Sequence, residues 1–411
     1  MADFVTHEEL VAQVAEATFA RPPALVANAH ITGLGVARAL ADHGVPVVAV
    51  DRTGDGVAPP SDAVDFAGRV TYPLDDLAGF RADVEAIADA AGTDLVAFGC
   101  MDEWVHAFAD TDPDGVRLPF APKDVVDAVL DKSSLYRIAD DLGVPYPETL
   151  WLSETSVDDA AETLGLPLVV QPARKREFEE AVGTNVVRVE TLAAFRDVVS
   201  TAREADVEVL AQEEVPVARG RDASLASYVP PSGVDDALGL VGNAAVRNPL
   251  GFGTACVVEQ VDLPDLEARA LSVLDETGYH GMSEAEFVYD TARETYVLLD
   301  INTRPWKWID FPVTAGANLP MAAYAEVTDA RYESAGVHDV TWVSLPDYLG
   351  LLADDAGVSD VLDPSDWRAF LSGAFESRPD LTAAVYRRSD PDPMVRLLQT
   401  EFGSREYYCS C

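Results

Sequence analysis

Two apolar runs near the start of the chain are separated by a glycine-containing turn and a helical stretch, and this order restricts the fold more than any other feature. Residues 24–28 form the first run, Gly33 and Gly35 open a helical stretch over residues 36–43, and residues 45–50 form the second run. Strand, turn, helix and strand in this order are typical of a βαβ unit, whose two strands pair in parallel. The sequence therefore predicts a parallel sheet with helices packed on it.

The same order repeats with a helical stretch at residues 77–91 and an apolar strand at residues 95–99. An amphipathic lead-in helix is predicted within residues 2–20. We expect residues 1–125 to form a doubly wound α/β domain. Arg38 stands where a dinucleotide-binding turn has its third glycine, so an architectural or substrate-side role is favoured over nicotinamide binding.

The chain carries 29 Lys and Arg residues against 71 Asp and Glu residues, which gives a formal net charge of −42. Such a surface repels phosphate backbones and anionic lipids, so neither nucleic acid nor a membrane is expected as a partner. The acids are spread along the chain, a pattern suited to concentrated salt, where screening removes their mutual repulsion, and we expect a halophilic source. The start of the chain lacks the basic and apolar segments of a signal peptide, so a cytoplasmic location is expected.

A β-hairpin is predicted over residues 286–302, where apolar and polar residues alternate on both sides of a polar five-residue loop. If Asp290 faces Tyr296 across the loop, Glu286 lies opposite Asp300, and Asn302 follows on the same face. The other face of the hairpin is expected to be buried, and it comprises Phe287, Tyr289, Val297, Leu299 and Ile301.

Two carboxylates and an amide on one face repel one another and lose hydration unless a cation lies between them. Hard oxygen ligands of this kind suit Mg²⁺ or Mn²⁺, above all where substrate phosphates complete the coordination shell. A solvated acidic hairpin is the alternative in a chain with 71 acids. Arg304 and Lys307, which follow the hairpin directly, supply two cations suited to an anionic reacting group and favour the metal site.

The segments around this hairpin resemble those of the ATP-grasp superfamily. Glu-Phe at residues 286–287 and Leu-Leu-Asp-Ile-Asn-Thr-Arg-Pro-Trp at residues 298–306 are similar to its metal-binding segment. Asp-Lys at residues 131–132 resembles its first lysine segment. Leu-Pro-Leu-Val-Val-Gln-Pro at residues 166–172 resembles its second phosphate lysine strand, and Gln-Glu-Glu-Val-Pro at residues 212–216 resembles its adenine hinge.

The resemblance covers roughly residues 24–325 and implies an ATP-grasp fold, in which two α+β lobes clamp ATP between their sheets behind a doubly wound pre-ATP-grasp domain. It implies a first lobe at residues 126–210 and a second lobe at residues 211–326. Residues 327–411 are then a C-terminal helical extension, in which the sequence indicates no motif.

The resemblance also implies a role for each matching position. Lys132 would contact the phosphates of ATP, and Arg304 would stabilise the acyl-phosphate and its tetrahedral successor. Arg247 would grip the carboxylate or the γ-phosphate. The remaining positions would hold the adenine (Glu213, Glu214 and Val215), the ribose (Asp222) and one or two magnesium ions (Glu286, Asp300 and Asn302).

Two positions depart from the pattern of the superfamily. Asp300 stands where glutamate is usual, which shortens the reach by one methylene group but keeps the charge. Gln171 stands where the second phosphate lysine is usual, and the loss of a charge-assisted contact costs about 1.5 to 3 kcal/mol. Either Lys175 or Arg174 is expected to reach in and restore the charge, or turnover is slow. Lys175 is one of only four lysines in the chain.

Within the superfamily, Asn-x-Arg-Pro-Trp at residues 302–306 looks most like the carboxylate-amine ligases related to D-aspartate ligase. We therefore expect a ligase that uses ATP and Mg²⁺ or Mn²⁺ to join a small carboxylate to an amine through an acyl-phosphate, with release of ADP and phosphate. Gln171 also fits a catalytically weak nucleotide-binding regulator or scaffold. A carboxylase lacks support because the sequence has no biotin-attachment segment of the Met-Lys-Met kind, and a homodimer is left open.

Overall fold

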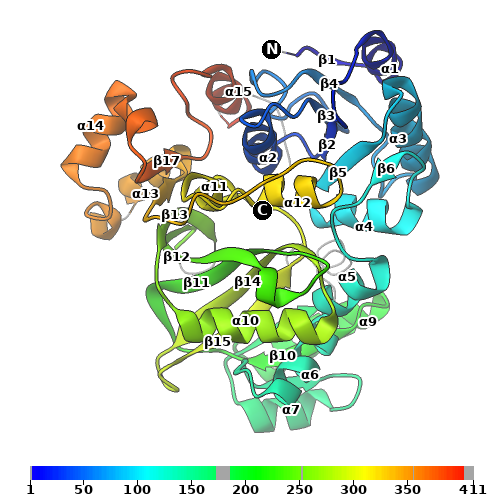
Figure 1. Ribbon diagram of the computed structural model, residues 1–411. Coiled ribbons are helices and arrows are strands. Elements are labelled where there is room, and N and C mark those ends of the chain that lie inside the picture. The colour runs from blue at the N-terminus through cyan, green and yellow to red at the C-terminus, as the bar shows by residue number, and fades with distance from the viewer. Residues whose placement is uncertain (1, 173–185, 251–252, 355, 402–411) are drawn as a thin grey trace.

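The computed structural model of the chain describes residues 2–172, 186–250, 253–354 and 356–401. The described strands form three sheets of six, four and seven strands. Figure 1 shows the six-stranded sheet with its helices at the top, the seven-stranded sheet below it and the four-stranded sheet at the bottom.

The leading domain contains the six-stranded sheet, in the order β1-β4-β3-β2-β5-β6, and its neighbouring strands are parallel. Strands β2, β3 and β5 are buried along their whole length, as expected for a parallel sheet with helices on both faces. The predicted doubly wound α/β fold is confirmed. Its elements are β1 (Phe4–Val5), α1 (His7–Glu16), β2 (Ala24–Ala27), α2 (Ile31–Ala41), β3 (Val47–Asp51), β4 (Phe66–Arg69), α3 (Leu77–Ala91), β5 (Leu95–Gly99), α4 (Asp102–Thr111) and β6 (Val116–Arg117).

Helix α2 begins earlier than predicted, so Gly33 and Gly35 lie inside the helix and not in a turn before it. A Cβ atom on Gly33 would lie 2.3 Å from the Asn28 carbonyl oxygen, and one on Gly35 would lie 2.6 Å from Ile309 Cγ2. The two glycines therefore permit close packing, one against the end of β2 and the other against a distant part of the chain. This packing supports the architectural role over nicotinamide binding.

The strand order of the leading domain reverses between β2 and β5. Strands β3 and β4 follow β2 on one side, and the chain then returns to add β5 on the other side of β2. Open parallel sheets bind ligands outside the carboxyl ends of their strands at such a point. Helices α2 and α4 begin there, and Thr32 and Asp102 in their first turns line the cavity described below.

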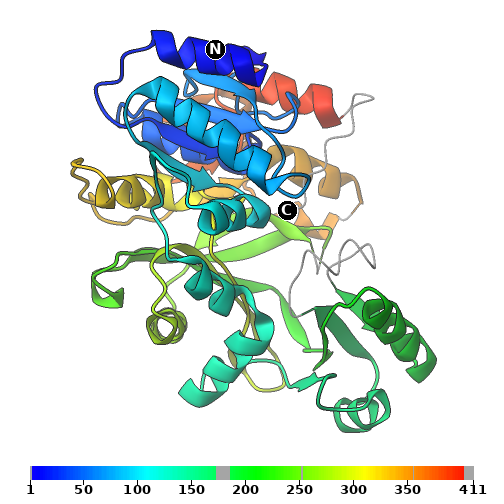
Figure 2. The ribbon, with the colours of Figure 1, turned by 90° about the vertical axis from the view of Figure 1, so that its right-hand side faces the viewer.

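The first lobe begins with two short helices in place of one continuous helix. Helices α5 (Lys123–Leu130) and α6 (Lys132–Leu142) meet at Asp131, which ends the first and caps the second by accepting a hydrogen bond from Ser134 N at 3.0 Å. Aspartate is favoured at helix N-caps, which explains the break. Figure 2 shows both helices running from the leading domain toward the four-stranded sheet.

The sheet of the first lobe is antiparallel, in the order β7-β10-β8-β9. Strand β8, which contains Gln171, pairs antiparallel with β9 at one edge of this sheet. Helices α7 and α9 pack on this sheet through the core of Ala160, Phe195 and Val199. The elements are β7 (Thr149–Trp151), α7 (Val157–Leu164), β8 (Leu168–Pro172), β9 (Val187–Val189), α9 (Leu192–Glu204) and β10 (Val209–Glu213).

The seven-stranded sheet has the order β15-β14-β11-β12-β13-β16-β17. Helix α10 lies across one face of it, as Figure 1 shows, and buries Leu266, Val273 and Leu274 against the sheet. The opposite face is turned toward the cavity. The elements are β11 (Val217–Val229), η1 (Val234–Asp236), β12 (Leu238–Asn248), β13 (Thr254–Gln260), α10 (Pro264–Thr277), β14 (Gly281–Asp290), β15 (Thr295–Asn302), α11 (Asp310–Thr314) and α12 (Leu319–Glu326).

The C-terminal segment, predicted as a helical extension, contains helices and also two strands. Strands β16 and β17 extend the seven-stranded sheet beyond β13. Helix α15 returns to the leading domain, where Arg396 Nη1 donates to the Gly54 carbonyl at 2.7 Å and Arg38 pairs with Asp390 at 2.8 Å. The elements are β16 (Thr341–Val343), α13 (Leu345–Asp354), η2 (Ala356–Val358), α14 (Pro364–Ser372), η3 (Ala374–Ser377), β17 (Leu381–Ala383) and α15 (Asp392–Glu401).

Among the described residues, no helix is both long enough and apolar enough to cross a membrane.

Candidate active site

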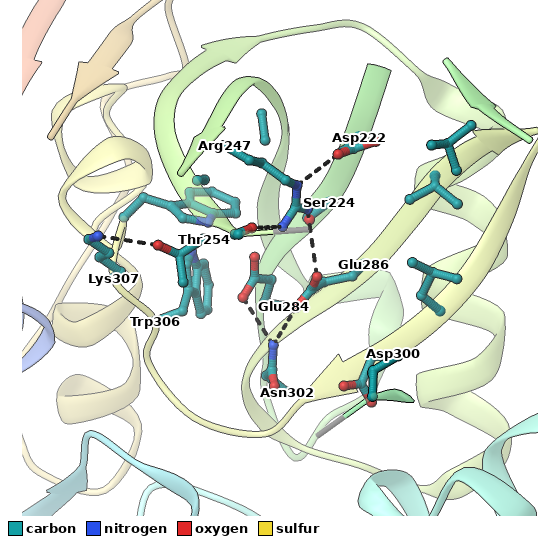
Figure 3. Close-up of a pocket in the computed structure, with 18 of the residues that line it drawn as sticks. Asp222, Ser224, Arg247, Thr254, Glu284, Glu286, Asp300, Asn302, Trp306 and Lys307 are labelled. Carbon is teal, nitrogen blue, oxygen red and sulfur yellow. Dashed lines mark hydrogen bonds and ion pairs between the residues drawn. The ribbon is translucent and has the colours of Figure 1, made fainter. Parts of the chain in front are cut away.

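A cavity of about 910 Å³ lies between the leading domain and the two lobes. Figure 3 shows the part of it in which charged side chains from neighbouring strands point toward one another. Every predicted site residue that the structure describes lines this cavity, and Lys175 lies outside the described residues. The lining residues that the sequence predicted are Lys132, Gln171, Glu213, Glu214, Val215, Asp222, Arg247, Glu286, Asp300, Asn302 and Arg304.

The polar floor of the cavity follows from the alternation of side chains along two paired strands. Successive residues of a strand point to opposite faces of its sheet, so β11 and β14 each present every second residue to the cavity. The residues that face helix α10 are apolar and buried: Ala223, Leu225, Ala285 and Phe287. Those that face the cavity are polar: Asp222, Ser224, Glu284 and Glu286.

The register of the hairpin was predicted wrongly at the loop and correctly at the site. Tyr289, not Asp290, lies opposite Tyr296. An irregularity in the pairing then shifts the register by one residue, and Glu286 lies opposite Asp300 as predicted. The two differences cancel where the carboxylates meet.

The residue that produces this shift is Leu299, which forms a bulge in β15. Phe287 pairs with Leu298 and Glu286 pairs with Asp300, so Leu299 has no opposing residue. The prediction that Leu299 is buried on the apolar face was therefore wrong. Leu298 occupies the core in its place with no exposed surface, and Leu299 lines the cavity.

The bulge also presents a carbonyl group to the first lobe. Leu299 O accepts hydrogen bonds from Lys132 Nζ at 2.9 Å and from the Tyr136 hydroxyl at 2.8 Å. Lys132 Nζ lies 3.2 Å from Asp300 Oδ1, and both side chains are more than nine-tenths buried. Lys132, a predicted phosphate contact, is thus held beside a predicted metal ligand.

Glu284 lies on the cavity face of the hairpin beside the three predicted metal ligands, and it was not among the predicted site residues. Asn302 Nδ2 donates to Glu286 Oε1 at 2.9 Å and to Glu284 Oε2 at 3.1 Å, as Figure 3 shows. Burial and the neighbouring Glu286 carboxylate raise the pKa of Glu284 to about 8. The period of two that selects Glu286 also selects the residue two positions earlier, so the signal for Glu284 was present in the sequence.

The residues on this face fit a magnesium ion that also binds phosphate. Among the described residues, no three Asp, Glu, His or Cys side chains converge tightly enough to hold a metal ion on their own. Mg²⁺ in nucleotide sites usually takes only one or two carboxylates, and waters and substrate phosphates fill the other positions. Glu286, Asp300 and Asn302 can supply that smaller set, because all three line the cavity.

Arg247 joins two acids at the edge of the floor. Its Nε donates to Asp222 Oδ2 at 2.7 Å, and its Nη2 lies 3.8 Å from Glu286 Oε2. Its Nη1 donates to the Gly253 carbonyl at 2.9 Å, so the guanidinium is fixed from three sides. Burial raises the pKa of Asp222, although Arg247 opposes the shift. Asp222, predicted to hold the ribose, is therefore paired with Arg247.

Arg304 links the second lobe to the leading domain. Its Nε donates to Asp102 Oδ1 at 2.5 Å, and its Nη1 donates to the Pro305 carbonyl at 3.1 Å. Asp102 is the first residue of α4, at the carboxyl end of the leading sheet. Asp102 could not be identified from the sequence, because its contact with Arg304 joins residues 202 positions apart.

The predicted adenine hinge lies at the end of the cavity nearest the first lobe. Glu213 Oε1 accepts a hydrogen bond from Glu148 N at 2.7 Å and also pairs with Arg293. Glu214 Oε1 accepts one from Arg188 Nε at 2.8 Å. Both acids are therefore engaged by neighbouring groups.

Gln171 is buried on β8, near Lys132, the predicted phosphate contact of the first lobe. Its Nε2 donates a weak hydrogen bond to the Tyr136 hydroxyl at 3.4 Å. The same hydroxyl donates to the Leu299 carbonyl beside Lys132. Gln171 is therefore connected to the polar network of the cavity without contributing charge to it.

No family model matches the sequence. The structure is similar to biotin carboxylase of Campylobacter jejuni in a β-γ-ATP complex (TM-score 0.61, 14% identity), and the match covers 76% of this chain and 72% of that one. It is also similar to L-amino acid ligase of Bacillus licheniformis (TM-score 0.55, 14% identity), with 75% of each chain covered. The chain has the ATP-grasp fold.

A third solved structure with this fold shows a nucleotide and a metal. It is the biotin carboxylase domain dimer of 2-oxoglutarate carboxylase from Hydrogenobacter thermophilus, in complex with MgADP, ADP and bicarbonate. Its TM-score is 0.59 at 14% identity, and the match covers 78% of this chain and 73% of that one. The ATP-grasp prediction is thus confirmed at the level of the fold.

Proposed function

We propose that the protein is an ATP- and magnesium-dependent carboxylate-amine ligase, which forms an amide bond through an acyl-phosphate and releases ADP and phosphate. One observation carries the proposal. Glu286, Asp300 and Asn302 line the same cavity as Lys132 and Arg304, in a chain with the ATP-grasp fold. Acidic ligands and cations in one buried place suit a metal–nucleotide complex beside an anionic substrate.

Two bond exchanges make up the proposed reaction. A carboxylate oxygen attacks the γ-phosphorus of ATP, the bond from that phosphorus to the β,γ-bridging oxygen breaks, and ADP leaves. The amine nitrogen then attacks the acyl carbon and loses a proton to solvent, the acyl carbon–oxygen bond to phosphate breaks, and phosphate leaves. Positioning and charge neutralisation carry most of the rate, and the site needs little acid–base machinery.

The residues of the cavity have separate tasks in this scheme. Magnesium, when bound, neutralises phosphate charge, and Glu286, Asp300 and Asn302 would hold it. Lys132 binds the phosphates from the first lobe. Arg304, oriented by Asp102, stabilises the acyl-phosphate and the tetrahedral species that follows it. The same proposal assigns Arg247 to the γ-phosphate or the carboxylate and Lys175 to the phosphates. It assigns the hinge and Asp222 to the nucleoside.

The experiment is phosphate release from Mg-ATP with a panel of small carboxylates and amines, including bicarbonate as an acid. We expect release only when a matching acid and amine are both present, with one phosphate per amide formed. ATP binding without phosphate release for any pair counts against the ligase.

A second candidate is a nucleotide-binding regulator with weak turnover, and the neutral Gln171 at a phosphate-lysine position favours it. The variants Gln171→Lys and Lys175→Ala separate the two functions. A large gain of ATPase activity in the first, together with no change in the second, supports the regulator. A loss of activity in Lys175→Ala supports the ligase, because Lys175 then supplies the charge that Gln171 lacks.

The expected partners are a small carboxylate and an amine, and a subunit of the same kind is a further candidate because one structural neighbour is a dimer. Kinship with D-aspartate ligase, a halophilic source and a cytoplasmic location remain predictions from the sequence. Activity measured across a range of KCl concentrations tests the halophilic source, and an optimum at low salt contradicts it.

A further inference from the structure

Lys307 is a positively charged residue that lines the cavity, and the proposed reaction assigns no role to it. Its side chain is 11% exposed, and Nζ donates to Asp347 Oδ2 at 2.7 Å and to Thr254 Oγ1 at 3.3 Å. Both partners lie outside the proposed magnesium ligands. An ammonium group has three donors, and these contacts use two of them, so one donor is available to a group in the cavity.

Asp347 comes from helix α13 of the C-terminal segment, for which the sequence indicated no role. It also accepts hydrogen bonds from Asn248 Nδ2 at 3.2 Å and from the Ser344 hydroxyl. These contacts fix the carboxylate, and the carboxylate in turn fixes the ammonium group at the cavity wall. The C-terminal segment therefore contributes to the shape of the site.

The wall beside Lys307 is aromatic and carries an unsatisfied donor. Trp306 is 3% exposed, and in Figure 3 it lies beside Lys307 and Thr254. Within the part of the chain that the structure describes, its indole N–H has no hydrogen-bond partner. Trp308 packs against it with ring centroids 5.1 Å apart. That N–H is itself covered by protein atoms, so the donor available to a ligand at this wall is the Lys307 ammonium group, and the two rings supply apolar surface beside it.

The charge balance at Lys307 selects the kind of acceptor. Asp347 cancels most of the ammonium charge, so the site suits a monoanionic carboxylate better than a dianionic phosphate. The reacting carboxylate belongs near the proposed magnesium ligands, where Arg247 lies 3.8 Å from Glu286. A carboxylate at Lys307 is therefore one that does not react.

We propose that Lys307, positioned by Asp347, binds a non-reacting carboxylate of a substrate. The inference rests on the proposed ligase function and narrows its substrates: either the amine is an amino acid, or the acid is a dicarboxylate. In both cases the carboxylate lies between the Lys307 ammonium group and the aromatic wall while the other end of the molecule reaches the magnesium ligands.

The test is calorimetric titration of the full chain, saturated with Mg²⁺ and a non-hydrolysable ATP analogue, with matched probes. One arm compares D- and L-amino acids with their α-carboxamides, and the other compares succinate and glutarate with their monoamides. For wild type, we expect a carboxylate-bearing probe in one arm to bind more tightly than its amide. Lys307→Met should weaken that probe by about 10- to 100-fold, the loss of one charge-assisted contact, and leave the amide unchanged.

Three controls make the outcome decisive. Lys123→Met removes an exposed lysine that pairs with Asp110 away from the cavity and should bind like wild type. Lys307→Arg keeps the positive charge and should retain most of the wild-type affinity for the carboxylate probe. Asp347→Asn leaves Lys307 charged but removes the carboxylate that positions it, so this affinity should fall between those of wild type and Lys307→Met. Circular dichroism and binding of the ATP analogue show that each variant is folded.

The results separate this inference from the proposed function. Failure of the ATP analogue to bind wild type overturns the ligase. Normal binding of the analogue overturns the role of Lys307 if no probe in either arm binds, or if Lys307→Met weakens carboxylate and amide probes equally. The arm that responds identifies which substrate carries the carboxylate.

Discussion

Replacing Lys132 by methionine tests the buried ion pair that joins the first lobe to the hairpin of the proposed metal ligands. Lys132 and Asp300 are 6% and 8% exposed and lie 3.2 Å apart. Removing one partner of a buried pair typically costs about 3–5 kcal/mol, because the other charge stays buried. Asp300 Oδ1 keeps a hydrogen bond from Ile301 N at 3.1 Å. We therefore expect a loss near the lower end, about 3 kcal/mol.

The assay is urea unfolding in magnesium-free buffer, because a bound cation would replace the missing ammonium group. The salt concentration is held fixed, since a chain of net charge −42 responds strongly to screening. Lys123→Met is the matched control. Its pair with Asp110 is 44% and 31% exposed, and exposed pairs contribute about 0–1 kcal/mol. The double variant Lys132→Met/Asp300→Asn removes the stranded charge and should recover part of the stability.

Two results would refute this reasoning. The first is a loss of stability in Lys132→Met no larger than in Lys123→Met. The second is strict additivity of Lys132→Met and Asp300→Asn, since residues in contact usually show a coupling of about 0.5–3 kcal/mol.

Three further predictions use separate parts of the structure. The pKa of Glu284 is raised to about 8 from 4.5, so without magnesium the wild type should lose stability relative to Glu284→Gln as the pH rises from about 4.5 to 8. The melting temperatures of both proteins measured against pH test this, and an equal dependence on pH contradicts it. Gly33→Ala should cost about 1–3 kcal/mol because its Cβ would lie 2.3 Å from a backbone oxygen, whereas Gly350→Ala, in a helix with nothing near, should stabilise by about 0.4–1 kcal/mol, as chemical denaturation can measure. Arg304→Met should lower kcat for phosphate release about 100- to 1,000-fold with little change in ATP affinity, while Arg81→Met, on an exposed pair, should not, and equal kcat values contradict the role of Arg304.

The leading domain was predictable because its strands are buried on both faces and read as continuous apolar runs. The hairpin was predictable because its alternation is local. Its exact register was not, since the bulge at Leu299 is stabilised by contacts with Lys132 and Tyr136, which lie far away in the sequence. No local pattern signals a carbonyl group that must meet a distant lysine.

Other differences between prediction and structure arise from very short strands or from contacts between residues far apart in the sequence. Strands β16 and β17 have three residues each, too few to show a period of two, and their pairing with β13 and with each other defines them. Asp102 and Asp347 could not be assigned to the candidate site from the sequence, because their partners Arg304 and Lys307 lie in another part of the chain. Glu284, in contrast, could have been found from the period of two alone.

The most direct test of the central claim is calorimetric titration of ATP into the protein with and without Mg²⁺, repeated for Glu286→Gln/Asp300→Asn. Magnesium should strengthen ATP binding to wild type by at least about tenfold, the equivalent of 1.4 kcal/mol, and should have little effect on the double variant. Equal ATP affinity with and without magnesium in wild type, or an unchanged magnesium effect in the double variant, would contradict a metal–nucleotide site on this hairpin.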